Sequence, residues 1–231
     1  MKAVLDRIDA RTAQHDALPF FRRIERPGSR AALEAIYTGL CFWVFTFQDV
    51  LVLNLARATD PELRALLAAH HREDCGHQQW YVADLRALGI EPSIEWAFGP
   101  EHAVTRHRCF ELMAAVLGAR HDTSRVSAVV ALEAAGGCIF SRMPGHVRSV
   151  GGSERLQYFS DMHFDVERSH QLHDDGLNQR LRATVVTHDA RSEGLALVDA
   201  IFDAIDAMIC GYEARAAHAE RATDPERQAF R

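Results

Sequence analysis

Several side chains of this sequence have the types and spacing of metal ligands. The pattern His-x3-(Asp/Glu)-x2-His occurs twice. Its members are His70, Asp74 and His77 in the first triplet, and His163, Glu167 and His170 in the second. On an α-helix, positions i, i+4 and i+7 lie on one stripe, so each triplet would present two imidazoles and a carboxylate to the same neighbour. Imidazole and carboxylate ligands together favour iron, manganese or zinc over calcium or magnesium. We take iron as the metal.

A seventh candidate, Glu133, is the only charged residue in the stretch 126–140, which is otherwise apolar or small. An ionised carboxylate buried there without a partner would be strongly disfavoured, and a metal ion would compensate its charge. We therefore expect Glu133 to bridge or flank one or two ions. A buried ion pair or a protonated Glu133 is the alternative.

The carboxylate of the first triplet is open to two interpretations, because Glu73 also lies within reach of His77 at i+4. Asp74 is preferred since it shares the stripe with both histidines of the triplet. Gln48 and Asp49 are weaker candidates for a partner that orients a ligand imidazole, and of the two we keep Asp49. His173 is expected to lie outside the ligand set. Solvated, charged helix faces remain the alternative for each triplet.

Helices are the elements that must position these residues. We expect helices over 30–58, over 59–88 through the first triplet, over 102–118, from 121 through Glu133 to 144, from 151 through the second triplet, and over 192–219. Ser29 suits an N-cap, and Thr59 with Glu62 fits a capping box. No segment shows convincing strand alternation. The sequence predicts an all-α fold, a single helical domain over residues 1–231 with roughly six to eight helices.

Composition excludes some classes of protein. A formal net charge of −6 without a Lys/Arg cluster argues against nucleic-acid binding. The N-terminus has no apolar signal core, and no stretch is expected to reach the length of a membrane span. The five widely spaced cysteines form no disulfide framework. We therefore expect a cytoplasmic protein that acts on a small molecule, with neither a membrane nor a nucleic acid as partner.

With these motifs, the chain resembles the heme-oxygenase-like superfamily. It resembles most the branch of diiron oxidases and oxygenases, which is related to thiaminase-type and PQQ-synthesis proteins. That branch has a late-helix motif, which His163, Glu167 and His170 match. It also has a lone Glu on a central helix, here Glu133, and a carboxylate with a His on an early helix, here His77. The sequence departs from the pattern at the early carboxylate, which is either Asp74 or replaced by His70.

The resemblance implies a non-heme Fe(II) cofactor, two ions in number, with O2 as co-substrate. Its members oxidise amino-acid-like or fatty-acid-like substrates, and the resemblance makes a homodimer plausible. Two alternatives remain open. A metal-free enzyme of the thiaminase or PQQ-synthesis type would use Cys138 in the same cavity. A heme-binding or other ligand-binding helical protein would need one histidine only and would not explain a carboxylate in each triplet.

Overall fold

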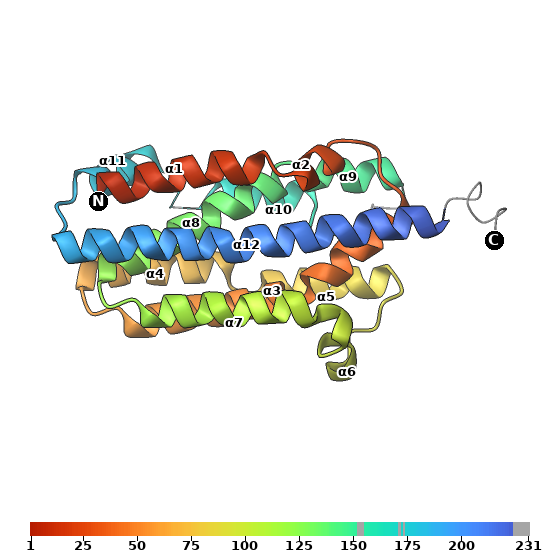
Figure 1. Ribbon diagram of the computed structural model, residues 1–231, viewed down its shortest axis with the longest axis horizontal. Helices are drawn as coiled ribbons and strands as arrows, with labels where there is room; N and C mark the ends of the chain where they lie inside the picture. The colour runs from red at the N-terminus through yellow and green to blue at the C-terminus, as the bar shows by residue number, and fades with distance from the viewer. Residues whose placement is uncertain (152–154, 171, 173, 224–231) are drawn as a thin grey trace.

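Helices joined by short links form this chain, and no strand occurs in its described part (Figure 1). The computed structural model describes residues 1–151, 155–170, 172 and 174–223. The helices are α1 (Lys2–Asp16), α2 (Pro19–Ile24), α3 (Arg30–Arg57), α4 (Pro61–Asp74), α5 (His77–Ala87), α6 (Ile94–Ala97), the 3-10 turn η1 (Pro100–His102), α7 (Ala103–Gly118), α8 (Asp122–Phe140), α9 (Met143–Val150), α10 (Asp161–Arg168), α11 (Asp175–Ala183) and α12 (His188–Thr223). The predicted all-α fold is confirmed.

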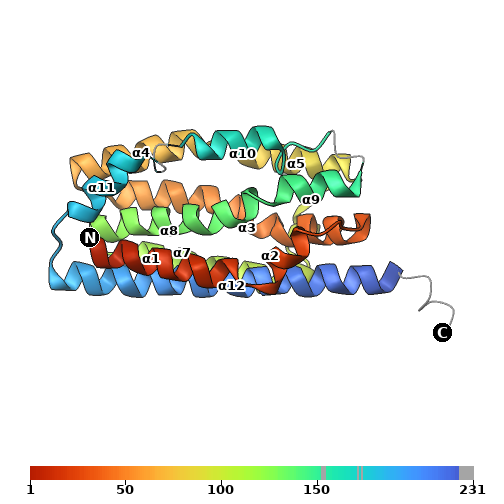
Figure 2. The ribbon, with the colours of Figure 1, turned by 90° about the horizontal axis from the view of Figure 1, so that it is seen from above.

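The helices are arranged in layers. The longest, α12, runs along the molecule and packs on α1, α3, α7 and α8 (Figure 1). In the view turned by 90°, α4, α5 and α10 lie along the edge opposite α12, with α3 and α8 between (Figure 2). Because α3 and α8 are covered on several sides, both are apolar on nearly every face.

Two central segments combine length and apolar composition to a degree that the sequence analysis did not allow for. Arg30–Arg57 and Asp122–Val150 each have the length and composition of a membrane span, so the expectation that no stretch reaches that length was wrong. In the fold, 56% of each apolar window is buried. Central helices of a globular bundle have the same property.

The helix expected over 59–88 is in fact two helices. Asp60, and not Thr59, caps α4, because its side chain accepts hydrogen bonds from the backbone N–H groups of Glu62 and Leu63. The break falls at Gly76, whose φ of +101° lies in the left-handed region that glycine adopts readily. A Cβ added there would meet nothing within 4 Å, so backbone conformation and not lack of space favours glycine.

The second half of the chain also has more breaks than predicted. The helix bearing Glu133 ends at Phe140, and Pro144 lies in a separate helix, α9. α10 begins only at Asp161, where the Ser160 side chain caps it by accepting from the His163 N–H. It ends at Arg168, so His170 lies just beyond it. The expected helix start at 152–154 and His173 lie outside the described residues.

Two smaller expectations are confirmed. The Ser29 hydroxyl accepts a hydrogen bond from the backbone N–H of Ala32 and so caps α3. All five cysteines are free, as the absence of a disulfide framework in the sequence indicated.

Candidate metal centre

The structure brings all seven predicted ligands together between α4, α5, α8 and α10. They divide into two clusters, and within each one the candidate ligand atoms all lie within 4.8 Å of one another. The four-residue cluster consists of His70, Asp74, Glu133 and His170, and the three-residue cluster consists of His77, His163 and Glu167. The solvated-face interpretation is wrong for these residues, since all seven are buried or nearly so.

In the four-residue cluster, α4 and α8 meet the segment that follows α10. His70 Nε2 lies 2.9 Å from Asp74 Oδ2 and 3.4 Å from Glu133 Oε1. His170 Nδ1 lies 3.8 Å from Glu133 Oε2. Two imidazoles therefore face two carboxylates across a space with the dimensions of a metal site.

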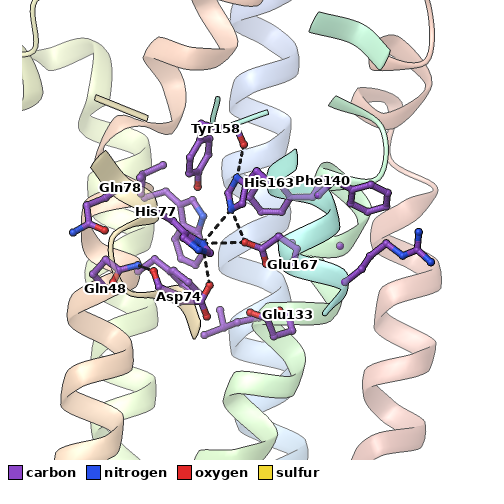
Figure 3. Close-up of a pocket in the computed structure, with 17 residues that line it drawn as sticks. Gln48, Asp74, His77, Gln78, Glu133, Phe140, Tyr158, His163 and Glu167 are labelled. Atoms are coloured by element: carbon purple, nitrogen blue, oxygen red, sulfur yellow. Dashed lines mark hydrogen bonds and ion pairs between the residues drawn. The ribbon is translucent and has the colours of Figure 1, made fainter. Parts of the chain in front are cut away.

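In the three-residue cluster, the N-terminal residue of α5 faces α10 (Figure 3). His163 Nε2 lies 2.7 Å from Glu167 Oε1 and 3.1 Å from His77 Nδ1. His77 Nδ1 is in turn 3.2 Å from Glu167 Oε1. Three donor atoms thus converge on one point.

Two carboxylates reach both clusters. Asp74 Oδ1 lies 3.5 Å from His77 Nδ1, while its Oδ2 faces His70. Glu167 Oε2 lies 3.6 Å from His170 Nδ1, while its Oε1 faces His163. Glu133 Oε1 and Oε2 lie near His70 and His170 of the four-residue cluster. The expectation that Glu133 bridges or flanks the ions stays a prediction.

The donor atoms fit a transition metal. Within the described residues, both ring nitrogens of His70 and of His170, together with Asp74 Oδ2, are buried and form no hydrogen bond, although charged partners lie close by. Buried polar atoms are normally hydrogen-bonded, and a shared cation would satisfy Asp74 Oδ2 and one nitrogen of each ring. Mixed nitrogen and oxygen donors of this kind suit iron, manganese or zinc.

The same contacts shift the pKa values of these residues in the metal-free protein. Burial lowers the pKa of His170, but the neighbouring Glu133, Glu167 and Asp74 carboxylates outweigh it and raise that pKa to about 9. Burial raises the pKa of Glu167, but contacts with His163 and His77 outweigh it and lower that pKa to about 2. Burial raises the pKa of Glu133. Protonated imidazole therefore compensates the carboxylate charge.

A cavity of about 90 Å³ adjoins the three-residue cluster. All three members of this cluster line it, as do Asp74 and Glu133, whereas His70 and His170 do not. Most of the remaining wall is apolar, and it is formed by Trp43, Val44, Phe47, Leu132, Gly136, Gly137, Phe140, Tyr158 and Phe164. Its other polar groups are Gln48, Gln78 and Arg168. The two clusters therefore differ in their access to open space.

The weaker candidates lie elsewhere. Asp49 is exposed, and its neighbour Gln48 is the residue at the site, where it donates to the Asp74 carbonyl oxygen over 3.1 Å. The expectation for Asp49 was therefore wrong by one position, which on a helix is a rotation of about 100°. Glu73 belongs to neither cluster.

Sequence reasoning missed two groups that contact the ligands. The Trp80 ring stacks on His77, with centroids 4.6 Å apart and planes at 15°. Its spacing of i+3 from His77 was a usable signal. The Tyr158 carbonyl oxygen lies 2.6 Å from His163 Nδ1, and no pattern in the sequence indicated it.

Cys138, which the metal-free alternative would use, does not line the cavity. Its thiol contacts the Ala134 carbonyl oxygen, and burial raises its pKa to about 12. A thiol with that pKa holds little thiolate at neutral pH and is a poor nucleophile.

Comparison with known proteins identifies the fold. No protein-family model and no curated protein matches the sequence. Among solved structures, the chain is similar to a domain of unknown function with a heme oxygenase-like fold from Shewanella denitrificans. The match has a TM-score of 0.59 at 15% identity and covers 92% of this chain and 89% of that chain. The chain therefore has a heme-oxygenase-like fold, as its resemblance to that superfamily predicted.

Proposed function

We propose that this protein is a non-heme diiron enzyme that uses O2 to oxidise a small organic substrate. The observation that supports it best is the pair of buried His/carboxylate clusters that share Asp74 and Glu167 and adjoin a cavity. Helical bundles commonly build two-metal carboxylate sites from ligands on facing helices. Two bound ferrous ions would supply the electrons that activate O2.

The two clusters would have different roles, each holding one ion. His70, Asp74, Glu133 and His170 would enclose one ion with four protein groups. His77, His163 and Glu167 offer three groups and face the cavity, which leaves room for O2 or substrate at the second ion. We therefore assign the reaction to the side of the three-residue cluster.

The cavity wall defines what the substrate would contact. Trp43, Phe47 and Phe140 give it an apolar surface that would exclude bulk water. Gln48 and Gln78 supply polar groups beside the ligands. This combination suits a small substrate with an apolar portion and a polar end, such as an amino-acid-like or fatty-acid-like molecule.

Anaerobic titration with Fe(II) tests the proposal on protein first stripped with a chelator. The wild type should bind two equivalents and then consume O2. Glu133→Gln should lose the equivalent in the four-residue cluster, and His163→Ala the one in the three-residue cluster. Asp74→Asn should weaken both sites, because Asp74 contacts both clusters.

Glu73→Gln is the matched control, since it changes a neighbouring carboxylate that lies in neither cluster, and it should keep two equivalents. Failure of the wild type to bind Fe(II), Mn(II) or Zn(II) would overturn the proposal. A Soret band on adding hemin, lost in one histidine variant alone, would favour heme binding instead.

A further inference from the structure

Asp84 is a buried carboxylate that belongs to neither cluster. It lies on α5, seven positions after His77, and is 0% exposed. Such a group is unfavourable in the interior unless hydrogen bonds compensate its lost hydration. Asp84 accepts three of them, from the Tyr37 hydroxyl (2.8 Å) and from the backbone N–H groups of Gln157 (2.7 Å) and Tyr158 (2.8 Å).

The two backbone contacts fix a segment that has no helical structure of its own. Residues 155–160 lead into α10, and Asp84 binds this link at its middle from the opposite helix. The next group along the link is the Tyr158 carbonyl, which faces His163 Nδ1 at 2.6 Å. Asp84 therefore holds the backbone immediately before that carbonyl.

The carbonyl in turn determines the protonation of His163. A carbonyl oxygen can only accept, so the proton of neutral His163 must be on Nδ1. The lone pair is then on Nε2, the atom that faces Glu167 and His77. A metal-ligating histidine needs this tautomer, and a hydrogen bond at its other nitrogen is the usual way to fix it.

We propose that Asp84 is the positioning residue of the three-residue cluster: it holds the Gln157–Tyr158 backbone so that the Tyr158 carbonyl fixes the Nδ1–H tautomer and the ring orientation of His163. The inference rests on the proposed function for its effect on metal binding. Its effect on the tautomer is independent of any metal.

Asp84→Asn is the test, because it preserves size and removes one of the two acceptor oxygens that the backbone contacts require. The His163 tautomer is read by 15N NMR of the histidine side chains in metal-free protein. Wild type should show Nδ1–H, and the variant a mixture of the two tautomers. In titrations with Zn(II), the affinity of the three-residue cluster should fall about 10- to 100-fold, while that of the four-residue cluster stays unchanged.

Asp122→Asn is the matched control. Asp122 also fixes a link by accepting backbone hydrogen bonds, from Thr59 and Asp60, but it begins α8, about 16 Å along that helix from Glu133. The Asp122→Asn substitution should lower the thermal unfolding temperature about as much as Asp84→Asn does, and it should leave the His163 tautomer and both metal affinities unchanged.

The outcomes separate the two proposals. A wild type that binds no metal defeats the proposed function, and the NMR measurement then decides on Asp84 alone. An Asp84→Asn protein that folds and keeps the wild-type tautomer overturns the inference. An Asp84→Asn protein in which both metal affinities fall equally also overturns it. A change of the His163 tautomer in Asp122→Asn would overturn it as well. If Asp84→Asn fails to fold, a Tyr37→Phe variant is measured in its place. This variant keeps both backbone contacts of Asp84 and should retain the wild-type tautomer, and loss of that tautomer would overturn the inference.

Discussion

At the residue scale, the protonation of histidine balances the charges of the centre before any metal binds. His170, with a pKa of about 9, is a cation at neutral pH, and Glu167, with a pKa of about 2, is an anion. The raised pKa of His170 contributes stability that is complete below its ordinary value of 6.5 and is lost as the pH rises through about 9. The lowered pKa of Glu167 contributes stability that is present above 4.5 and is lost as the pH falls through about 2.

Metal affinity should rise with pH, which is opposite to the pH dependence of the stability that His170 contributes. An ion must displace the proton of His170, so affinity should fall about tenfold for each pH unit below 9. Calorimetric titration with Mn(II) from pH 6 to pH 8, in two buffers with different ionisation enthalpies, measures both the affinity and the proton released. An affinity independent of pH, with no proton released, would contradict this prediction.

At the element scale, the spacing of the ligands predicted their convergence even though the helices are shorter than expected. Asp74 ends α4 and His77 begins α5. His170 lies past α10, but its backbone N–H still donates to the Glu167 carbonyl oxygen in a turn. Turn geometry was therefore enough to keep each triplet together.

Other features depend on tertiary packing that a sequence pattern does not contain. Thr59 and Asp60 are both good capping residues, and Asp60 takes that role because the Thr59 hydroxyl and N–H donate to Asp122 of α8. The sharing of Asp74 and Glu167 between clusters has the same origin, since it requires the relative placement of α4, α5 and α10. The sequence analysis did not predict the left-handed backbone of Gly76.

The break at Gly76 can be tested by substitution. Gly76→Ala should lower the free energy of unfolding by about 1–2 kcal/mol, because a residue with a Cβ is strained at this positive φ. It should also weaken Mn(II) binding, since the break sets His77 relative to Asp74. Chemical denaturation and metal titration measure the two effects.

Gly89→Ala is the control for that substitution. Gly89 also has a positive φ and open space around a Cβ, but it follows the other end of α5. It should cost similar stability and leave metal affinity unchanged. Equal losses of metal affinity in both variants would show that the break has no special part in the centre.

At the scale of the whole molecule, one side of the bundle supplies the packing framework and the other supplies the ligands. α12 packs on α1, α3, α7 and α8, and the candidate ligands come from α4, α5, α8 and the region of α10 (Figures 1 and 2). Among the helices just named, α8 belongs to both sides through Glu133.

Bound metal should therefore stabilise the fold measurably. At a free concentration one hundred times its Kd, one ion adds about 2.7 kcal/mol to the free energy of unfolding. In a protein of this size, that raises the Tm by roughly 5–10 °C. Calorimetry with Mn(II) and with excess EDTA measures the difference, and Asp74→Asn should reduce it. Identical Tm values for the wild type under both conditions would contradict metal binding to the native state.

The contact between His77 and His163 joins two residues that are 86 positions apart in the chain. An ion held by both would cross-link the two ends of this long stretch in the native state, and it would oppose local opening of this side of the bundle. This cross-link would be reversible, so the supply of metal in a cell would set how stable this side of the bundle is.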